Sequence, residues 1–161
     1  MSGDSQRKVA AIIGGGVIGG GWAARFLLHG WDVRVCDPDP EAERKINEVL
    51  GNGRRSLPGI YNEVLPAEGD VQFTGSIAEA VTDAQWIQES VPERLEVKHA
   101  VYPEIQAAAR DDAVLASSTS GFKPSQLAEG AVNPGQILVA HPYNPVYLLP
   151  LVEIVQHPHS D

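Results

Sequence analysis

The chain has 161 residues, of which 43% are hydrophobic and 20% charged, a composition typical of one globular domain that folds without disulfides or metal. Its formal net charge of −9 disfavours nucleic acids and anionic membranes as partners and suits a cationic small molecule. Cys36 is the single cysteine, which excludes an intrachain disulfide and indicates a reducing compartment. The polar N-terminus lacks a signal-peptide core and no apolar run could cross a membrane, so we expect a cytoplasmic protein.

Strands and helices are predicted to alternate along most of the chain. Short apolar runs predict strands at residues 9–13, 33–36, 71–73, 86–90, 114–117, 137–140 and 151–155. Helical spacing and capping residues predict helices at residues 22–28, 40–50, 76–82 and 94–110, with a glycine-dense turn at 14–21 and a kink at Pro103. This alternation predicts an α/β fold with a doubly wound, mostly parallel sheet.

A G-x-G-x-x-G motif lies between the first predicted strand and the first helix. Gly14 permits a tight turn, Gly16 lets the backbone approach a pyrophosphate, and Gly19 lets the helix pack closely on the strand. The predicted cofactor-binding residues of this turn are Gly14, Gly16, Val17, Ile18 and Gly19. The alternative is a purely structural glycine turn. The motif and its position predict a Rossmann-type dinucleotide-binding domain.

Asp37 ends the second predicted strand, where a carboxylate can bind the ribose hydroxyls of a dinucleotide. Its charge would repel the additional phosphate of NADP, and no arginine follows it directly. The predicted cofactor is therefore NAD. The alternative role for Asp37 is to cap a helix.

Polar residues follow the fifth and sixth predicted strands. Ser117, Ser118, Thr119 and Ser120 come after the fifth strand, at the edge of the sheet where doubly wound folds bind ligands. His141, flanked by prolines, follows the sixth. The alternatives are an ordinary polar loop and a loop histidine whose hydrogen bonds are satisfied.

Glu153 lies inside the last predicted strand, whose other residues are apolar. Burying a carboxylate there costs several kcal/mol unless it is paired. His141 is the economical partner, and the two together would form a general base near neutral pH. The alternative is that Glu153 faces solvent on an edge strand. The remaining histidines are scattered, so no metal site is predicted.

Together, these residues resemble the NAD-binding domain of the 3-hydroxyacyl-CoA dehydrogenase superfamily. The likeness rests on residues 14–19, on residues 117–120, and on HPYNP followed by LPLVEIV, and it extends from about Val9 to Val155. It implies NAD-dependent oxidation of a 3-hydroxy acid to the 3-oxo acid.

The resemblance also implies a role for each site residue. His141 is then the general base, Glu153 orients it, Ser120 holds the substrate hydroxyl, and Asn144 supports the loop. By the same match, Glu93 and Lys98 lie against the nicotinamide half of the cofactor, although spacing alone suggests only a weak ion pair on a helix face.

One departure from the superfamily pattern bears on the substrate. Acyl-CoA members insert a long, lysine-bearing helical hairpin after the second strand, but residues 40–70 are short here. Their basic residues are Arg44, Lys45, Arg54 and Arg55. We therefore expect a small 3-hydroxy acid with a quaternary ammonium group, for which Tyr143 and Tyr147 are candidate cage residues. Acyl-CoA thioesters and sugar acids stay open as alternatives.

The domain organisation follows from the same likeness. We expect a disordered tail at residues 1–7, the NAD-binding domain at 8–157, and at 158–161 the start of a linker to a C-terminal helical domain that this chain lacks. In the superfamily that domain completes the substrate pocket and the homodimer interface. The chain by itself is then either part of an enzyme or an NAD-binding module that is inactive alone.

Overall fold

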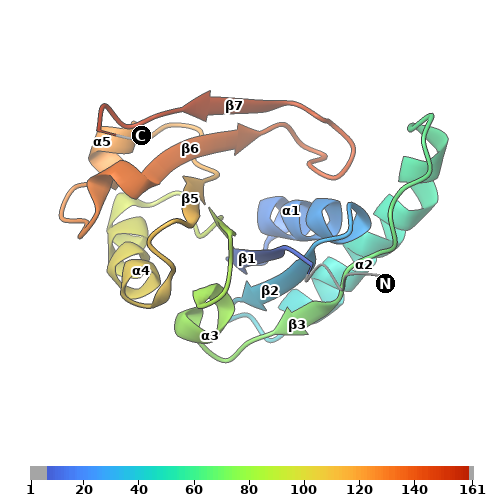
Figure 1. Cartoon of the computed structure of the whole chain (residues 1–161), viewed down its shortest axis with the longest axis horizontal. Coiled ribbons are helices and arrows are strands. Elements are labelled where there is room, and N and C mark those ends of the chain that lie inside the picture. Colours follow the sequence, from blue (N-terminus) through green and yellow to red (C-terminus); the bar gives the residue numbers. More distant parts are fainter. Residues whose placement is uncertain (1–6, 160–161) are drawn as a thin grey trace, which may run out of the picture.

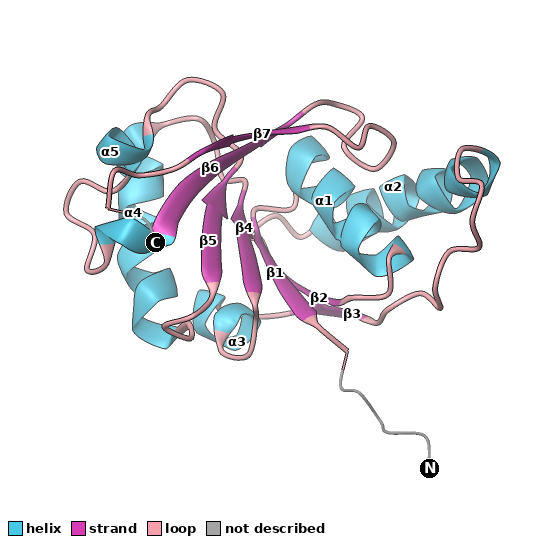
Figure 2. Ribbon diagram, turned by 45° about the horizontal axis from the view of Figure 1, so that its top comes forward, coloured by secondary structure: helices cyan, strands magenta, loops and turns pink. Residues whose placement is uncertain are grey.

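Seven strands form one sheet in the order β3-β2-β1-β4-β5-β6-β7. The structure is a computed structural model, and it describes residues 7–159. The strands are β1 (Val9–Ile13), β2 (Asp32–Cys36), β3 (Val71–Phe73), β4 (Trp86–Glu89), β5 (Val114–Ser117), β6 (Ile137–Pro142) and β7 (Val152–Val155). All pairs are parallel except β6 with β7, as Figure 2 shows at one edge of the sheet. The predicted doubly wound, mostly parallel sheet is confirmed.

Helices cover both faces of this sheet (Figure 1). They are α1 (Val17–Leu28), α2 (Ala42–Ser56), α3 (Ile77–Val81), α4 (Leu95–Ala108) and α5 (Pro124–Leu127), with short 3-10 turns at Leu57–Gly59 and Pro134–Gln136. Strand β1 shows why both faces are apolar. Ala10 and Ile12 pack in the cluster under α1 and α2, whereas Ala11 and Ile13 pack in the cluster under α3 and α4. A strand covered on both faces reads as a continuous apolar run, which is the pattern seen in the sequence.

Two helices are longer than predicted because tertiary packing outweighs the low helix propensity of glycine. Helix α1 begins at Val17 rather than residue 22, so it includes part of the predicted turn. Helix α2 continues to Ser56 rather than ending at residue 50. It contains Gly53, at which a Cβ would lie only 2.7 Å from Leu28 Cδ1, so glycine permits the close approach of α2 to α1.

Strand β6 is also longer than predicted, and this changes the setting of His141. The strand continues to Pro142 because it pairs with β7, so His141 lies within β6 and not in the loop after it. Near the other edge, the Ser76 hydroxyl caps α3 by accepting a hydrogen bond from Glu79 N, and the Glu79 carboxylate accepts one from the backbone of Gly75.

Some predictions fall at the ends of the chain. Residues 1–6 and 160–161, which include most of the expected tail and part of the expected linker, lie outside the described residues. Within residues 7–159, no helix is long and apolar enough to span a membrane, and no cluster of histidine, cysteine, aspartate or glutamate could hold a metal ion.

The close packing of α1 on β1 predicts opposite outcomes for two glycines of the turn. A Cβ on Gly19 would lie 1.8 Å from Gly14 O, whereas a Cβ on Gly16 would meet nothing within 4 Å. We expect Gly19→Ala to lower the free energy of unfolding by about 3 kcal/mol. We expect Gly16→Ala, the matched control, to change it by less than about 1 kcal/mol. Chemical denaturation measures both, and equal stabilities would contradict this account of Gly19.

Candidate functional site

Three adjoining pockets lie along the carboxyl ends of the parallel strands, where the strand order reverses between β1 and β4. The glycine-loop pocket, about 660 Å³, lies between the turn after β1 and the ends of β2 and β4. It shares Ser90 and Val91 with the central pocket of about 330 Å³. The central pocket in turn shares Ser120 and His141 with the outer pocket of about 480 Å³, which opens beside β7. The three pockets therefore form a continuous row.

The glycine-loop pocket has the geometry that a dinucleotide needs. Gly14 has a φ of +96°, and a Cβ there would lie 2.6 Å from Ser90 O. The space beside Gly16 is open, so a phosphate can approach the backbone at the N-terminus of α1. The lining is largely apolar, which suits an adenine ring, and includes Ile13, Ile77, Val97 and Val101.

Asp37 lies in this pocket at the end of β2, as predicted. Its carboxylate accepts hydrogen bonds from the backbone N–H of Gly15 and, at 2.7 Å, from that of Asp39. Its position ties the glycine turn to β2 and places a negative charge beside the pocket. No lysine or arginine lines the pocket in the described part of the chain. These features favour NAD over NADP, because the additional phosphate of NADP would find a carboxylate and no cation.

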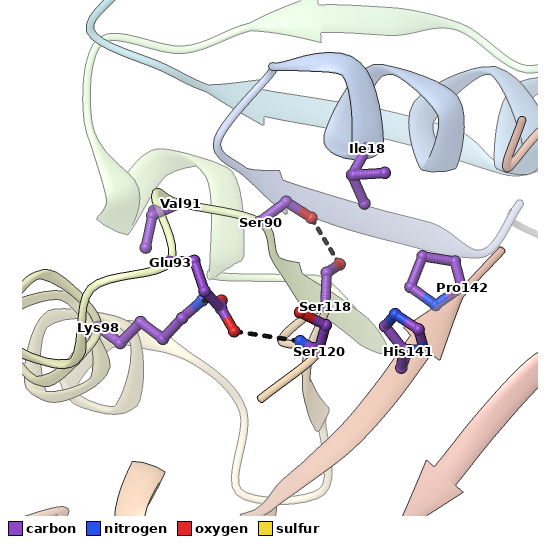
Figure 3. A pocket seen from close by; sticks show the side chains of 9 residues that line it. All are labelled: Ile18, Ser90, Val91, Glu93, Lys98, Ser118, Ser120, His141 and Pro142. Atoms are coloured by element: carbon purple, nitrogen blue, oxygen red, sulfur yellow. Dashed lines mark hydrogen bonds and ion pairs between the residues drawn. The ribbon is translucent and has the colours of Figure 1, made fainter. Parts of the chain in front are cut away.

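Side chains from α1, α4, β6 and the loops after β4 and β5 converge on the central pocket (Figure 3). Ile18 projects from α1 on one side, and His141 and Pro142 come from β6 on another. Glu93 lies just before α4 and Lys98 in its first turns, across the pocket from His141. The remaining lining residues are Ser90, Val91, Ser118 and Ser120. Of the predicted site residues, this pocket brings together Ile18, Glu93, Lys98, Ser120 and His141.

The antiparallel pairing of β6 with β7 brings His141 and Glu153 together. The two residues are direct cross-strand partners, and His141 Nδ1 lies 3.0 Å from Glu153 Oε2. The hydrogen bond from His141, and then the one from Tyr143, lower the pKa of Glu153 below its ordinary value. The expected contact is therefore present, but its expected cause is wrong. The Glu153 side chain is 58% exposed on an edge strand, so burial does not force the pairing.

Ser120 is held by Glu93. The Glu93 carboxylate accepts hydrogen bonds from the hydroxyl of Thr119, from Ser120 N at 3.1 Å and from Gly121 N at 3.2 Å. Burial raises the pKa of Glu93, but the Thr119 bond and the charge of Lys98 outweigh it and leave the pKa below its ordinary value. Glu93 is thus an ionised clamp on the loop that carries Ser120.

Three predicted residues line none of the three pockets, and one of them is Gly19, which is buried in α1. Asn144 is exposed in the loop after β6 and lines none of the three pockets. Val17 is 69% exposed at the start of α1, where its backbone rather than its side chain could contact a phosphate.

Sequence reasoning missed Glu89, the last residue of β4, which is fully buried. Its carboxylate accepts hydrogen bonds from Lys98 Nζ at 2.8 Å, Val91 N at 2.9 Å, Tyr102 Oη at 2.8 Å and Ser117 Oγ at 2.6 Å. Burial and the neighbouring Glu89 charge raise the pKa of Tyr102, so this phenol stays protonated as a donor. A glutamate in a strand predicted to be buried was the available signal, because a buried carboxylate requires partners.

The row of pockets defines a dinucleotide-binding domain of the Rossmann type, with a histidine–carboxylate pair at the end of the cofactor groove. The family model of the 3-hydroxyacyl-CoA dehydrogenase NAD-binding domain matches residues 9–161. The chain belongs to this family, and its cofactor is NAD.

Curated relatives carry the same region. The chain is 69% identical over 151 residues to an L-carnitine dehydrogenase/betainyl-CoA thioesterase of Ruegeria pomeroyi, with 94% of this chain and 31% of that protein covered. It is 47% identical over 148 residues to an L-carnitine dehydrogenase of Oceanobacillus iheyensis, with 92% of this chain and 48% of that protein covered. The chain thus spans between about a third and a half of the length of these relatives.

Solved structures share the fold. A 5-formyl-3-hydroxy-2-methylpyridine 4-carboxylic acid 5-dehydrogenase, described as an NAD+-dependent dismutase, superposes with a TM-score of 0.86 at 30% identity, with 96% of this chain and 50% of that chain covered. A 3-hydroxybutyryl-CoA dehydrogenase from Escherichia coli gives a TM-score of 0.82 at 24% identity, with 96% and 34% covered, which supports the fold alone.

Proposed function

We propose that this chain is the NAD-binding part of an enzyme that oxidises the 3-hydroxyl group of L-carnitine to a ketone, giving 3-dehydrocarnitine. The observation that carries the proposal is that Ser120 and His141 line both the central and the outer pocket. A hydroxyl group bound on the outer side can therefore contact both residues while its carbon faces a hydride acceptor on the inner side. The names of the relatives from Ruegeria pomeroyi and Oceanobacillus iheyensis support L-carnitine as the substrate.

His141 and Glu153 supply the acid–base step. Because Nδ1 of His141 donates to Glu153, the neutral imidazole keeps Nε2 free to accept the substrate hydroxyl proton. Glu153 then stabilises the imidazolium that forms. Ser120 orients the hydroxyl oxygen, and Glu93 fixes the loop that carries Ser120. NAD, when bound, accepts the hydride from the carbon.

Two features beside the outer pocket, whose lining also includes Lys123, favour a small substrate with an ammonium group. After β2 the described chain forms the single helix α2 and a short 3-10 turn, not a long helical hairpin that could hold CoA. The Tyr143 ring lies 5.6 Å from the His141 ring and is exposed, so it can face an ammonium group. Tyr147 instead packs beside Gly53 of α2, which leaves Tyr143 as the cage candidate.

This chain and the longer protein are proposed to have different parts of the activity. Because the chain spans less than half of its relatives, we propose NAD binding for the chain itself and substrate oxidation for the whole enzyme. Retained NAD affinity without turnover, restored in a longer polypeptide, would identify the chain as a binding module. The homodimer stays a prediction of the family resemblance, and the cytoplasmic location stays a prediction from the sequence.

A substrate panel tests the proposed reaction. The longest available form of the protein is given NAD+ with L-carnitine, L-gulonate or 3-hydroxybutyryl-CoA, and NADH formation is followed by absorbance. We expect turnover with L-carnitine and rates at least about 100-fold lower with the other two, since they lack the cationic group. Preferred turnover of the CoA ester or of L-gulonate would contradict the substrate assignment and leave the roles of His141 and Glu153 open to test.

Substitutions in the histidine–carboxylate pair test the mechanism. We expect His141→Ala to lower kcat by about 1,000-fold while the Kd of NAD+ changes by less than about threefold, because the imidazole acts in proton transfer. Glu153→Gln should lower kcat by about 10- to 100-fold, since it keeps a hydrogen-bond acceptor but loses the charge that stabilises the imidazolium. Tyr143→Phe keeps the charge of Glu153 and the aromatic ring but removes a hydrogen bond to Glu153, so as the matched control it should lower kcat by less than Glu153→Gln. Unchanged turnover in His141→Ala would exclude its role as the base.

A further inference from the structure

Three charged side chains lie in contact at the inner wall of the central pocket. Lys98 Nζ lies 2.8 Å from Glu89 Oε1 and 3.3 Å from Glu93 Oε2, so one ammonium group bridges two carboxylates. We call Glu89, Lys98 and Glu93 the charged triad. Two carboxylates and one ammonium leave the triad with a net charge of −1.

Two of the three charged groups of the triad, Glu89 and Lys98, are held in a region with little water. The Glu89 side chain is 0% exposed and that of Lys98 1% exposed, whereas that of Glu93 is 44% exposed and faces the pocket. Charges in such surroundings are screened much less than charges at the surface. The Glu89 carboxylate accepts four hydrogen bonds from the protein, one of them from the ammonium group of Lys98. The remaining titratable residue that lines the pocket is His141, which the proposed mechanism requires to be neutral.

The nicotinamide ring has to lie in this pocket if the proposed function holds. It accepts hydride from a carbon whose oxygen contacts Ser120 and His141, and both residues line the central pocket. Shared residues Ser90 and Val91 connect this pocket to the glycine-loop pocket, where the other half of the cofactor fits. The oxidised nicotinamide ring carries a positive charge, and the reduced ring is neutral.

We propose that the charged triad of Glu89, Lys98 and Glu93 is an electrostatic site that selects the oxidation state of the cofactor, favouring NAD+ over NADH. The net negative charge attracts the oxidised ring and has little effect on the reduced one. Favouring NAD+ suits an enzyme that oxidises its substrate and must release NADH. Glu89 contributes through charge alone, because Lys98 and the strand end separate it from the pocket. The inference rests on the proposed position of the nicotinamide ring.

The test compares the affinities of both cofactor forms in charge variants. NADH binding is followed by its fluorescence and NAD+ binding by displacement of NADH, in the longest available form of the protein. In Glu89→Gln the triad loses one negative charge, so the ratio of Kd for NAD+ to Kd for NADH should rise about fivefold. Glu93→Gln, at a half-exposed position, should raise the same ratio and provides the test if Glu89→Gln does not fold.

Two control variants separate charge from structure. Tyr102→Phe removes one hydrogen bond that the Glu89 carboxylate accepts and changes no charge. The ratio of Kd for NAD+ to Kd for NADH should therefore stay within about twofold of wild type. The double variant Glu89→Gln/Lys98→Met restores the net charge of the wild type and should return the ratio toward its value. An unchanged ratio in both glutamine variants, or an equal shift in Tyr102→Phe, would overturn the inference. These readouts need no substrate, so a wild-type protein that binds both cofactor forms but does not oxidise L-carnitine would contradict only the proposed function.

Discussion

The buried carboxylate of Glu89 is the constraint around which the site is organised. A charge at the end of a strand that is covered on both faces must receive hydrogen bonds from its surroundings, and the donors come from helix α4, from strand β5 and from Val91 in the loop after β4. Lys98 and Tyr102 bring helix α4 against β4, and Ser117 joins the end of β5 to the same group. Removing Lys98 would leave the buried carboxylate without a positively charged partner, so α4 is held against the end of β4.

The same arrangement helps to position the residues proposed to contact the substrate. Lys98 forms ion pairs with both Glu89 and Glu93, and the Glu93 carboxylate accepts hydrogen bonds from the backbone of Ser120 and Gly121. On the other side, the pairing of β6 with β7 sets His141 opposite Glu153. Glu93 therefore positions Ser120, the proposed hydroxyl-binding residue, and the pairing with Glu153 positions His141, the proposed base. Both residues lie where the central and outer pockets join.

The local features of the sequence predicted the sheet and the cofactor turn well. Continuous apolar runs such as Val9–Ile13 indicate strands that are buried on both faces. The glycine spacing indicates that the first helix packs closely on the preceding turn, and the lack of space for a Cβ at Gly19 confirms this. Non-local contacts were harder to predict. The exposure of Glu153 depends on β7 being an edge strand, which no local pattern reveals. Likewise, the length of α2 depends on the packing of Gly53 against α1, and Glu89 was overlooked because its four partners are spread from residue 91 to residue 117.

The central claim is that hydride passes from the hydroxyl-bearing carbon of L-carnitine to the cofactor in this row of pockets. Isotope transfer tests it most directly: the longest form of the protein is given NAD+ and L-carnitine deuterated at carbon 3, and the reduced cofactor is analysed by mass spectrometry. The account predicts that each NADH formed carries the deuterium from that carbon. Unlabelled NADH, or the absence of NADH from an otherwise folded protein that binds NAD+, would contradict it.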